Sequence, residues 1–109
     1  MTMETKNIFK QISAAAGEEQ FLTLLECNGV KIQRIVSHAS STPENEWYDQ
    51  SYTEWVSVLR GHAILQFQGG EPVELKEGDY LAIPPHARHR VDETAPETIW
   101  LVVHLTAAT

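Results

Sequence analysis

Cysteine, basic residues and long apolar runs are all scarce in this chain of 109 residues. The one cysteine, Cys27, has no partner for an internal disulfide, so the cysteine content gives no sign of secretion, and we expect a small buried side chain. Lys and Arg number 8 against 15 Asp and Glu, which gives a net charge of -7. Nucleic acids and anionic membranes bind basic surfaces, so this balance argues against both as partners.

The apolar segments are too short for membrane insertion or export. No run approaches the length of a transmembrane helix, and residues 1–11 lack the apolar stretch of a signal peptide, so we expect a cytoplasmic protein. The length predicts a single domain over residues 1–109, large enough to enclose one hydrophobic core.

Short strand-like segments separated by turn residues make up most of the chain. In 62–67, HAILQF, apolar and polar residues alternate as in a half-buried strand. Segment 99–105, IWLVVHL, is apolar in both phases, so we expect it to be buried on both sides or to lie in a subunit interface. Residues 18–26 fit either a short helix or an extended segment. The pattern predicts an all-β sandwich or barrel with at most a short N-terminal helix.

Two stretches carry a more specific signal. Segment 54–61, EWVSVLRG, has a Glu followed after six residues by a Gly. Segment 78–90, GDYLAIPPHARHR, has a Gly, then Pro84 after five residues, then His89. Their order and separation resemble the two motifs of the cupin family, in a small single-domain member of the RmlC-like jelly-roll type. The resemblance covers about residues 30–105 and implies a double-stranded β-helix barrel, but no single reaction, because this fold hosts many.

The resemblance also implies a metal site. Cupins hold a divalent transition metal with two histidines before the first-motif Glu, that Glu, and the second-motif His; here Glu54 and His89 match and the two upstream histidines are missing. Spacing favours Gln50 as a substitute, because it shares a strand face with Glu54. Ligand chemistry favours Asp49, because a charged carboxylate binds a divalent ion better than an amide. We therefore predict a mixed site of Glu54 and His89 with Gln50 or Asp49, which would accept Fe, Mn, Ni or Zn.

Three further side chains are candidates for a substrate pocket. Tyr48 lies just before the predicted metal ligands. Arg34 would contact an anionic ligand if it points inward, although a surface position beside an acid fits the sequence equally well. His104 shares a phase with Trp100 and Val102, so it either reaches the barrel interior or is a buried, hydrogen-bonded histidine.

These residues favour a small metal-binding cupin, of oxygenase or isomerase type, that acts on a small organic substrate. One alternative is a metal-free module for a small polar or anionic ligand, which the missing histidine pair supports. Another is a non-catalytic regulatory dimer. We expect a homodimer in any case, because a short jelly roll leaves strand edges that need to be covered.

Overall fold

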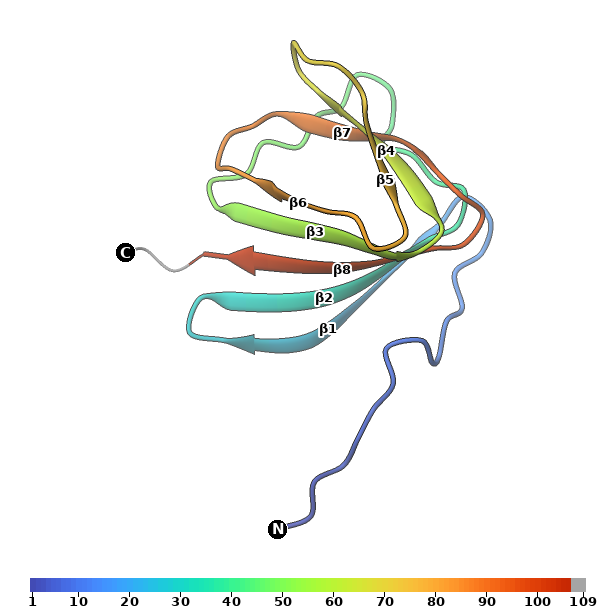
Figure 1. The fold of residues 1–109 in the computed structure, drawn as a ribbon, viewed down its shortest axis with the longest axis vertical. Helices are drawn as coiled ribbons and strands as arrows, with labels where there is room; N and C mark the ends of the chain where they lie inside the picture. The colour runs from blue at the N-terminus through green and yellow to red at the C-terminus, as the bar shows by residue number, and fades with distance from the viewer. Residues whose placement is uncertain (107–109) are drawn as a thin grey trace.

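Two antiparallel β-sheets face each other and form a barrel (Figure 1). A computed structural model describes residues 1–106; this part of the chain has no helix, and therefore no helix that could cross a membrane. Its strands are β1 (Glu19–Cys27), β2 (Val30–Ser37), β3 (Thr53–Arg60), β4 (His62–Phe67), β5 (Val73–Lys76), β6 (Tyr80–Ile83), β7 (His89–Thr94) and β8 (Thr98–Leu105). One sheet has the order β1-β2-β8-β3-β6 and the other β5-β4-β7, which confirms the predicted all-β jelly roll.

The apolar segment near the C-terminus is β8, the central strand of the larger sheet. It pairs with β2 on one edge and with β3 on the other. Trp100 and Val102 face the inside of the barrel, and Ile99 on the opposite face is also fully buried. Burial on both faces therefore explains why this strand is apolar in both phases.

The hydrophobic core lies between the two sheets. Val58 of β3 and Ala63 and Leu65 of β4 are at most 2% exposed. The alternation predicted for 62–67 is confirmed, because Ala63 and Leu65 are buried while Ile64 between them is partly exposed. These side chains fix the distance between the sheets and so the width of the barrel.

Residues 19–27 form an edge strand, which selects the extended alternative for this segment. The apolar side chains of 21–25 are exposed on this strand, and its register with β2 shifts between Thr23 and Leu25. The shift breaks the alternation that would have identified a strand. Cys27 at the strand end is exposed, so the prediction of a buried cysteine is wrong; the edge of the sheet offers nothing to cover it.

Arg34 of β2 is buried on the sheet face that points away from the barrel interior. Its neighbour Gln33 lines the interior, so strand alternation turns Arg34 to the other side. There its guanidinium donates hydrogen bonds to the backbone carbonyls of Ile8 (3.1 Å), Lys10 and Gln11 (3.3 Å). The prediction of Arg34 as a pocket residue is therefore wrong, because its side chain lies on the other face of the sheet and its terminal nitrogens, Nη1 and Nη2, are bonded to the N-terminal segment.

Candidate functional site

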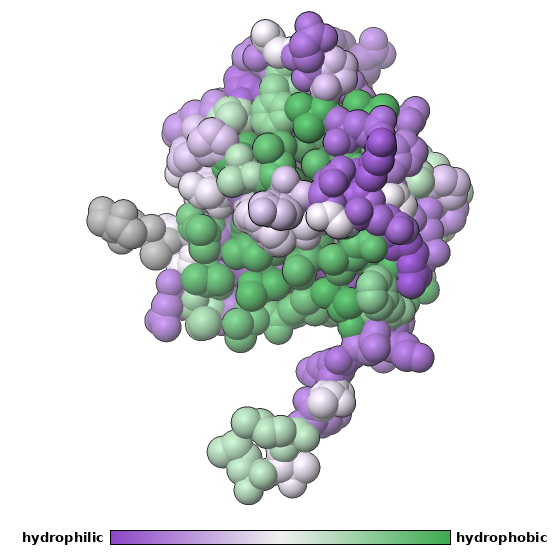
Figure 2. All heavy atoms as spheres, in the orientation of Figure 1, coloured by the Kyte–Doolittle hydropathy of each residue, from purple (hydrophilic) through white to green (hydrophobic). Residues whose placement is uncertain are grey.

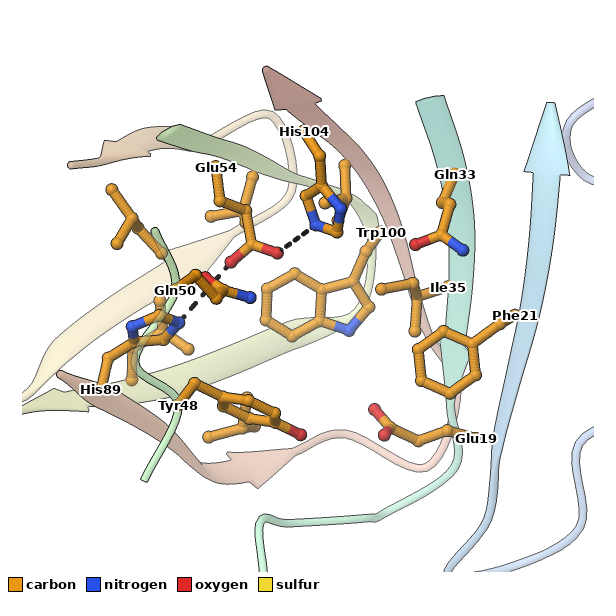
Figure 3. A pocket seen from close by; sticks show the side chains of 15 residues that line it. Glu19, Phe21, Gln33, Ile35, Tyr48, Gln50, Glu54, His89, Trp100 and His104 are labelled. Atoms are coloured by element: carbon orange, nitrogen blue, oxygen red, sulfur yellow. Dashed lines mark hydrogen bonds and ion pairs between the residues drawn. The ribbon is translucent and has the colours of Figure 1, made fainter. Parts of the chain in front are cut away.

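The barrel encloses a pocket of about 180 Å³ between the two sheets (Figure 3). Its walls are largely apolar and include Val56, Leu65 and Trp100. The polar side chains at the buried end, called the inner end below, come from three strands and one loop: Gln50, Glu54, His89 and His104. A pocket with apolar walls and a few convergent polar groups is the usual form of a small-molecule site.

Glu54 and His104 are directly opposed residues of β3 and β8. Nε2 of His104 donates a hydrogen bond to Oε2 of Glu54 at 2.6 Å, and the ring of Tyr52 packs on the imidazole with centroids 4.9 Å apart. Glu54 is 9% exposed, so it faces inward as its place in the first motif suggests. For His104, both alternatives hold together, since it reaches the interior and is hydrogen-bonded there.

His89 is the first residue of β7 and faces the other oxygen of Glu54. Its Nδ1 lies 2.7 Å from the carbonyl oxygen of Ala87, which can only accept, so Nδ1 carries a proton. Nε2 then points into the pocket, 3.5 Å from Oε1 of Glu54. A neutral His89 would direct a lone pair at this carboxylate, so the geometry favours either a proton or another cation between them.

The pKa values of this pair are set by the same contacts. Burial alone would raise the pKa of Glu54, but the hydrogen bonds from His89 and His104 outweigh it and hold that pKa below its ordinary value. Burial alone would lower the pKa of His89, but its hydrogen bonds to Glu54 and to the carbonyl of Ala87 raise it above the ordinary value. The contacts at the inner end therefore favour the ionised form of Glu54 and the protonated form of His89.

The structure separates the two candidates that the sequence left open. Gln50 lines the pocket beside Glu54. Asp49 points away and pairs with His86, whose Nδ1 lies 2.8 Å from the carboxylate on the exposed rim. The backbone N–H of His86 also donates to the carbonyl of Gln50 at 2.7 Å, which ties this loop to the residues before β7. The Asp49 alternative is therefore wrong for the pocket, because its side chain is already held outside.

Tyr48 lines the more open part of the pocket, as predicted. Its backbone forms a two-way bridge with His89, with N–H to carbonyl distances of 2.7 and 3.1 Å. Its ring lies against the imidazole, with centroids 5.7 Å apart. Tyr48 thus ties the loop before β3 to the start of β7 and fixes the orientation of His89.

Two polar residues of the pocket were not predicted from the sequence, Glu19 of β1 and Gln33 of β2. Glu19 could not be assigned because segment 18–26 had no clear strand pattern. The side chain of Gln33 does alternate with Arg34, but both phases of that strand are mixed in polarity. Their position depends on the pairing of β1 with β2, for which the sequence carries no motif.

The inner end is not a preformed metal site. Among residues 1–106, no group of three or more His, Cys, Asp or Glu side chains already stands in a metal-binding arrangement. The direct hydrogen bond between His104 and Glu54 occupies two of the donor atoms that a metal ion would use.

Comparison with known proteins adds a family match. The model of the Cupin_2 family, described as a cupin domain, matches residues 32–104. A curated relative from Ruegeria pomeroyi, a 3-hydroxyanthranilate 3,4-dioxygenase, is 33% identical over 61 residues, which are 53% of this chain and 34% of the relative. The chain thus spans about a third of that enzyme's length, so the similarity concerns one part of it.

Solved structures support the same fold. A protein from Ralstonia eutropha, provisionally named a mannose-6-phosphate isomerase, superposes with a TM-score of 0.89 at 40% identity, over 96% of this chain and 100% of that one. An RmlC-like cupin from Methanocaldococcus jannaschii, with a double-stranded β-helix fold, superposes with a TM-score of 0.69 at 17% identity, over 88% of this chain and 87% of that one.

Proposed function

The chain belongs to the cupin domain family, and from this premise we propose that it binds a divalent transition metal and acts on a small organic substrate as a metal-dependent enzyme. The observation that carries the proposal is the convergence of Glu54, His89 and His104 at the inner end of the pocket. The dioxygenase name of one relative and the provisional isomerase name of another support an enzyme of one of these two types.

The donor atoms at the inner end fit a metal ion in kind, since imidazole nitrogens and a carboxylate are ordinary ligands of divalent transition metals. Oε1 of Glu54 lies 3.5 Å from Nε2 of His89, and Oε2 lies 2.6 Å from Nε2 of His104. To hold one ion, the bond between His104 and Glu54 would have to open and the two imidazoles would have to converge on the carboxylate. The bond from Nδ1 of His89 to the Ala87 carbonyl is the outer contact that orients most metal-bound histidines.

His104 therefore takes the place in the proposed ligand set that the missing upstream histidines leave open. Glu54, His89 and His104 would hold the metal, with the Gln50 amide beside them as a further oxygen donor. A metal held there would supply Lewis-acid activation of a bound oxygen atom or, as Fe, redox chemistry. The chain itself would orient the substrate between Tyr48 and the apolar walls and would exclude water from the inner end.

Metal titration tests the proposal. Chelator-stripped protein titrated with Mn²⁺, Ni²⁺, Zn²⁺ or, without oxygen, Fe²⁺ is expected to bind one ion per chain in isothermal calorimetry. Because the pKa of His89 is raised, protons compete with the metal for its Nε2, so affinity is expected to fall about tenfold per pH unit once the pH drops below that pKa. Absence of uptake at every pH tested, including alkaline pH where protons compete least, would contradict the proposal.

A second candidate function is binding of a small polar ligand without a metal. The short hydrogen bond between His104 and Glu54 favours it, because the carboxylate is satisfied by protein donors alone. A ligand whose affinity is unchanged by a chelator would support this candidate. A ligand whose binding is abolished by a chelator would support the metal-dependent enzyme.

We further propose that two copies of the chain associate through β1. This strand lies at the edge of the larger sheet, and Phe21, Leu22, Leu24 and Leu25 on it are each at least 40% exposed. Figure 2 shows hydrophobic atoms gathered along the side of the molecule where β1 and β2 lie. An exposed, apolar edge strand is open to pairing with another strand, and a second copy offers the same surface in return.

Light scattering at high micromolar concentration is expected to give twice the chain mass of 12.3 kDa. The Leu22→Lys variant places a charge on the proposed contact and is expected to shift the mass to that of one chain. The Glu71→Lys variant, on a turn far from β1 in the sequence, serves as the control and should leave the dimer intact. A wild-type protein with the mass of one chain under these conditions would contradict the dimer.

A further inference from the structure

The more open part of the pocket has a chemistry of its own. Glu19 and Phe21 of β1, Gln33 of β2 and Tyr48 line this part, called the outer end below. Figure 3 shows the carboxylate of Glu19 and the hydroxyl of Tyr48 on facing sides, with Trp100 between them and the inner end. A molecule in the pocket would therefore meet the inner end at one extremity and Glu19 at the other.

The Glu19 carboxylate is held in place by a chain of buried donors. Nε1 of Trp100 donates to Oγ of Ser37 at 3.1 Å, and that hydroxyl donates to Oε2 of Glu19 at 2.8 Å. Ser37 is fully buried, and it is the residue of β2 that pairs with Glu19. These bonds leave Oε1 of Glu19 free to accept a hydrogen bond from a ligand.

The charge of Glu19 is not compensated inside the pocket. None of the described residues that line it is a lysine or an arginine. Arg34, the buried arginine of β2, lies on the opposite face of the sheet and binds backbone carbonyls there. The other pocket carboxylate, Glu54, is paired with two imidazoles, whereas Glu19 accepts from the neutral hydroxyl of Ser37. The pKa of Tyr48 is raised by burial and then by the charge of Glu19.

The size and the walls of the pocket limit the body of the ligand. An apolar cavity of about 150 Å³ holds benzene, and the pocket here measures about 180 Å³. Val56, Leu65 and Trp100 offer apolar surface along the pocket wall. A single six-membered ring with short substituents fits these limits.

We propose that Glu19 determines substrate specificity, by selecting a ligand with an apolar, ring-sized body and a cationic amine at the end remote from Glu54. This inference deepens the proposed function, and it rests on that function only for the role of the inner end. The same carboxylate would repel a phosphate or a carboxylate group at the outer end, since like charges brought together in a partly desolvated site are unfavourable. A sugar phosphate with its phosphate at the outer end is therefore disfavoured.

Three probes of matched shape test the inference: benzylamine, benzyl alcohol and benzoate, titrated into chelator-stripped protein and followed by calorimetry. Benzylamine is expected to bind about fivefold more tightly than benzyl alcohol, as for one partly exposed ion pair. Benzoate is expected to bind most weakly. The Glu19→Gln variant should lower benzylamine affinity to that of benzyl alcohol and leave benzyl alcohol unchanged. The neighbouring Glu18→Gln variant, which removes the same charge outside the pocket, should keep the preference for the amine.

Three results would overturn the inference. They are binding of benzoate or mannose 6-phosphate at least as tight as that of benzylamine, no binding of any of the three probes at millimolar concentration, and an unchanged benzylamine affinity in Glu19→Gln. Because no metal is present in these titrations, they are independent of metal uptake. An amine preference without metal uptake would support this inference and contradict the metal-dependent enzyme. Metal uptake without an amine preference would support the metal-dependent enzyme and contradict this inference.

Discussion

The Glu54→Ala variant is expected to bind a divalent metal at least about 100-fold more weakly than the wild-type protein. Among the described residues at the inner end, Glu54 is the one carboxylate, and it stands between His89 and His104. Its removal takes away the negative charge that attracts the ion and a donor atom next to each imidazole. Loss of a residue that only hydrogen-bonds to a metal ligand costs 10- to roughly 100-fold in metal affinity. Loss of a ligand itself is therefore expected to cost more.

Two variants control for changes that are not specific to the ligand set. Glu54→Gln keeps the size of the side chain and an oxygen donor, and is expected to give an intermediate affinity. Glu19→Ala removes a carboxylate from the outer end of the same pocket and should leave metal affinity unchanged. Each variant is titrated by calorimetry after its thermal unfolding has been compared with that of the wild type. Undiminished metal affinity in Glu54→Ala would contradict the proposed ligand set.

The Gly61→Ala variant is expected to lower the free energy of unfolding by about 3 kcal/mol. Gly61 joins β3 to β4 with a φ of +87°, and a Cβ there would lie 2.6 Å from the carbonyl oxygen of Glu97 and 2.9 Å from Cα of Thr98. The left-handed backbone costs a side chain about 1–2 kcal/mol, and overlap with fixed backbone atoms adds about 1–3 kcal/mol. Urea denaturation followed by tryptophan fluorescence measures the difference.

Gly69→Ala is the matched control for this change. Gly69 has a φ of +79°, and a Cβ there would meet no atom within 4 Å. The variant therefore carries the backbone cost alone, and we expect about 1–2 kcal/mol. Equal losses in the two variants would show that the contact with the loop before β8 contributes nothing and that the first-motif glycine is needed only for its backbone conformation.

The fold could be predicted because its signals are local. Gly61 and Gly78 both have a φ near +90°, which few side chains tolerate, so both turns are visible in the sequence as glycines at fixed spacing from Glu54 and Pro84. Strand alternation likewise predicted the inward position of Gln50, although Gln50 precedes β3. The chain bends at Ser51 and Tyr52, so the inward position of Gln50 does not come from an unbroken strand; the bond from the His86 N–H to the Gln50 carbonyl instead ties this loop to the residues before β7. The role of Gln50 as a ligand stays a prediction.

The remaining site residues depend on contacts between distant parts of the chain. His104 meets Glu54 only through the register of β8 with β3. Glu19 enters the pocket through its pairing with Ser37 on an edge strand without clear alternation. Arg34 is turned away from the pocket, and its terminal nitrogens donate to carbonyls more than twenty residues earlier in the chain. No local pattern encodes these pairings, so the sequence alone placed the motif residues better than their partners.

Arg34 binds an N-terminal segment that lies outside the part of the chain matched by the family model. The family match begins at residue 32 and leaves out β1 as well as residues 8–11. A chain trimmed to the match would lose the carbonyls that accept from the Arg34 guanidinium, together with β1, the strand that pairs with β2. We therefore expect a piece that begins at or before residue 8 to be more stable than one that begins at residue 32, and an excised domain for engineering should include the sequence ahead of the match.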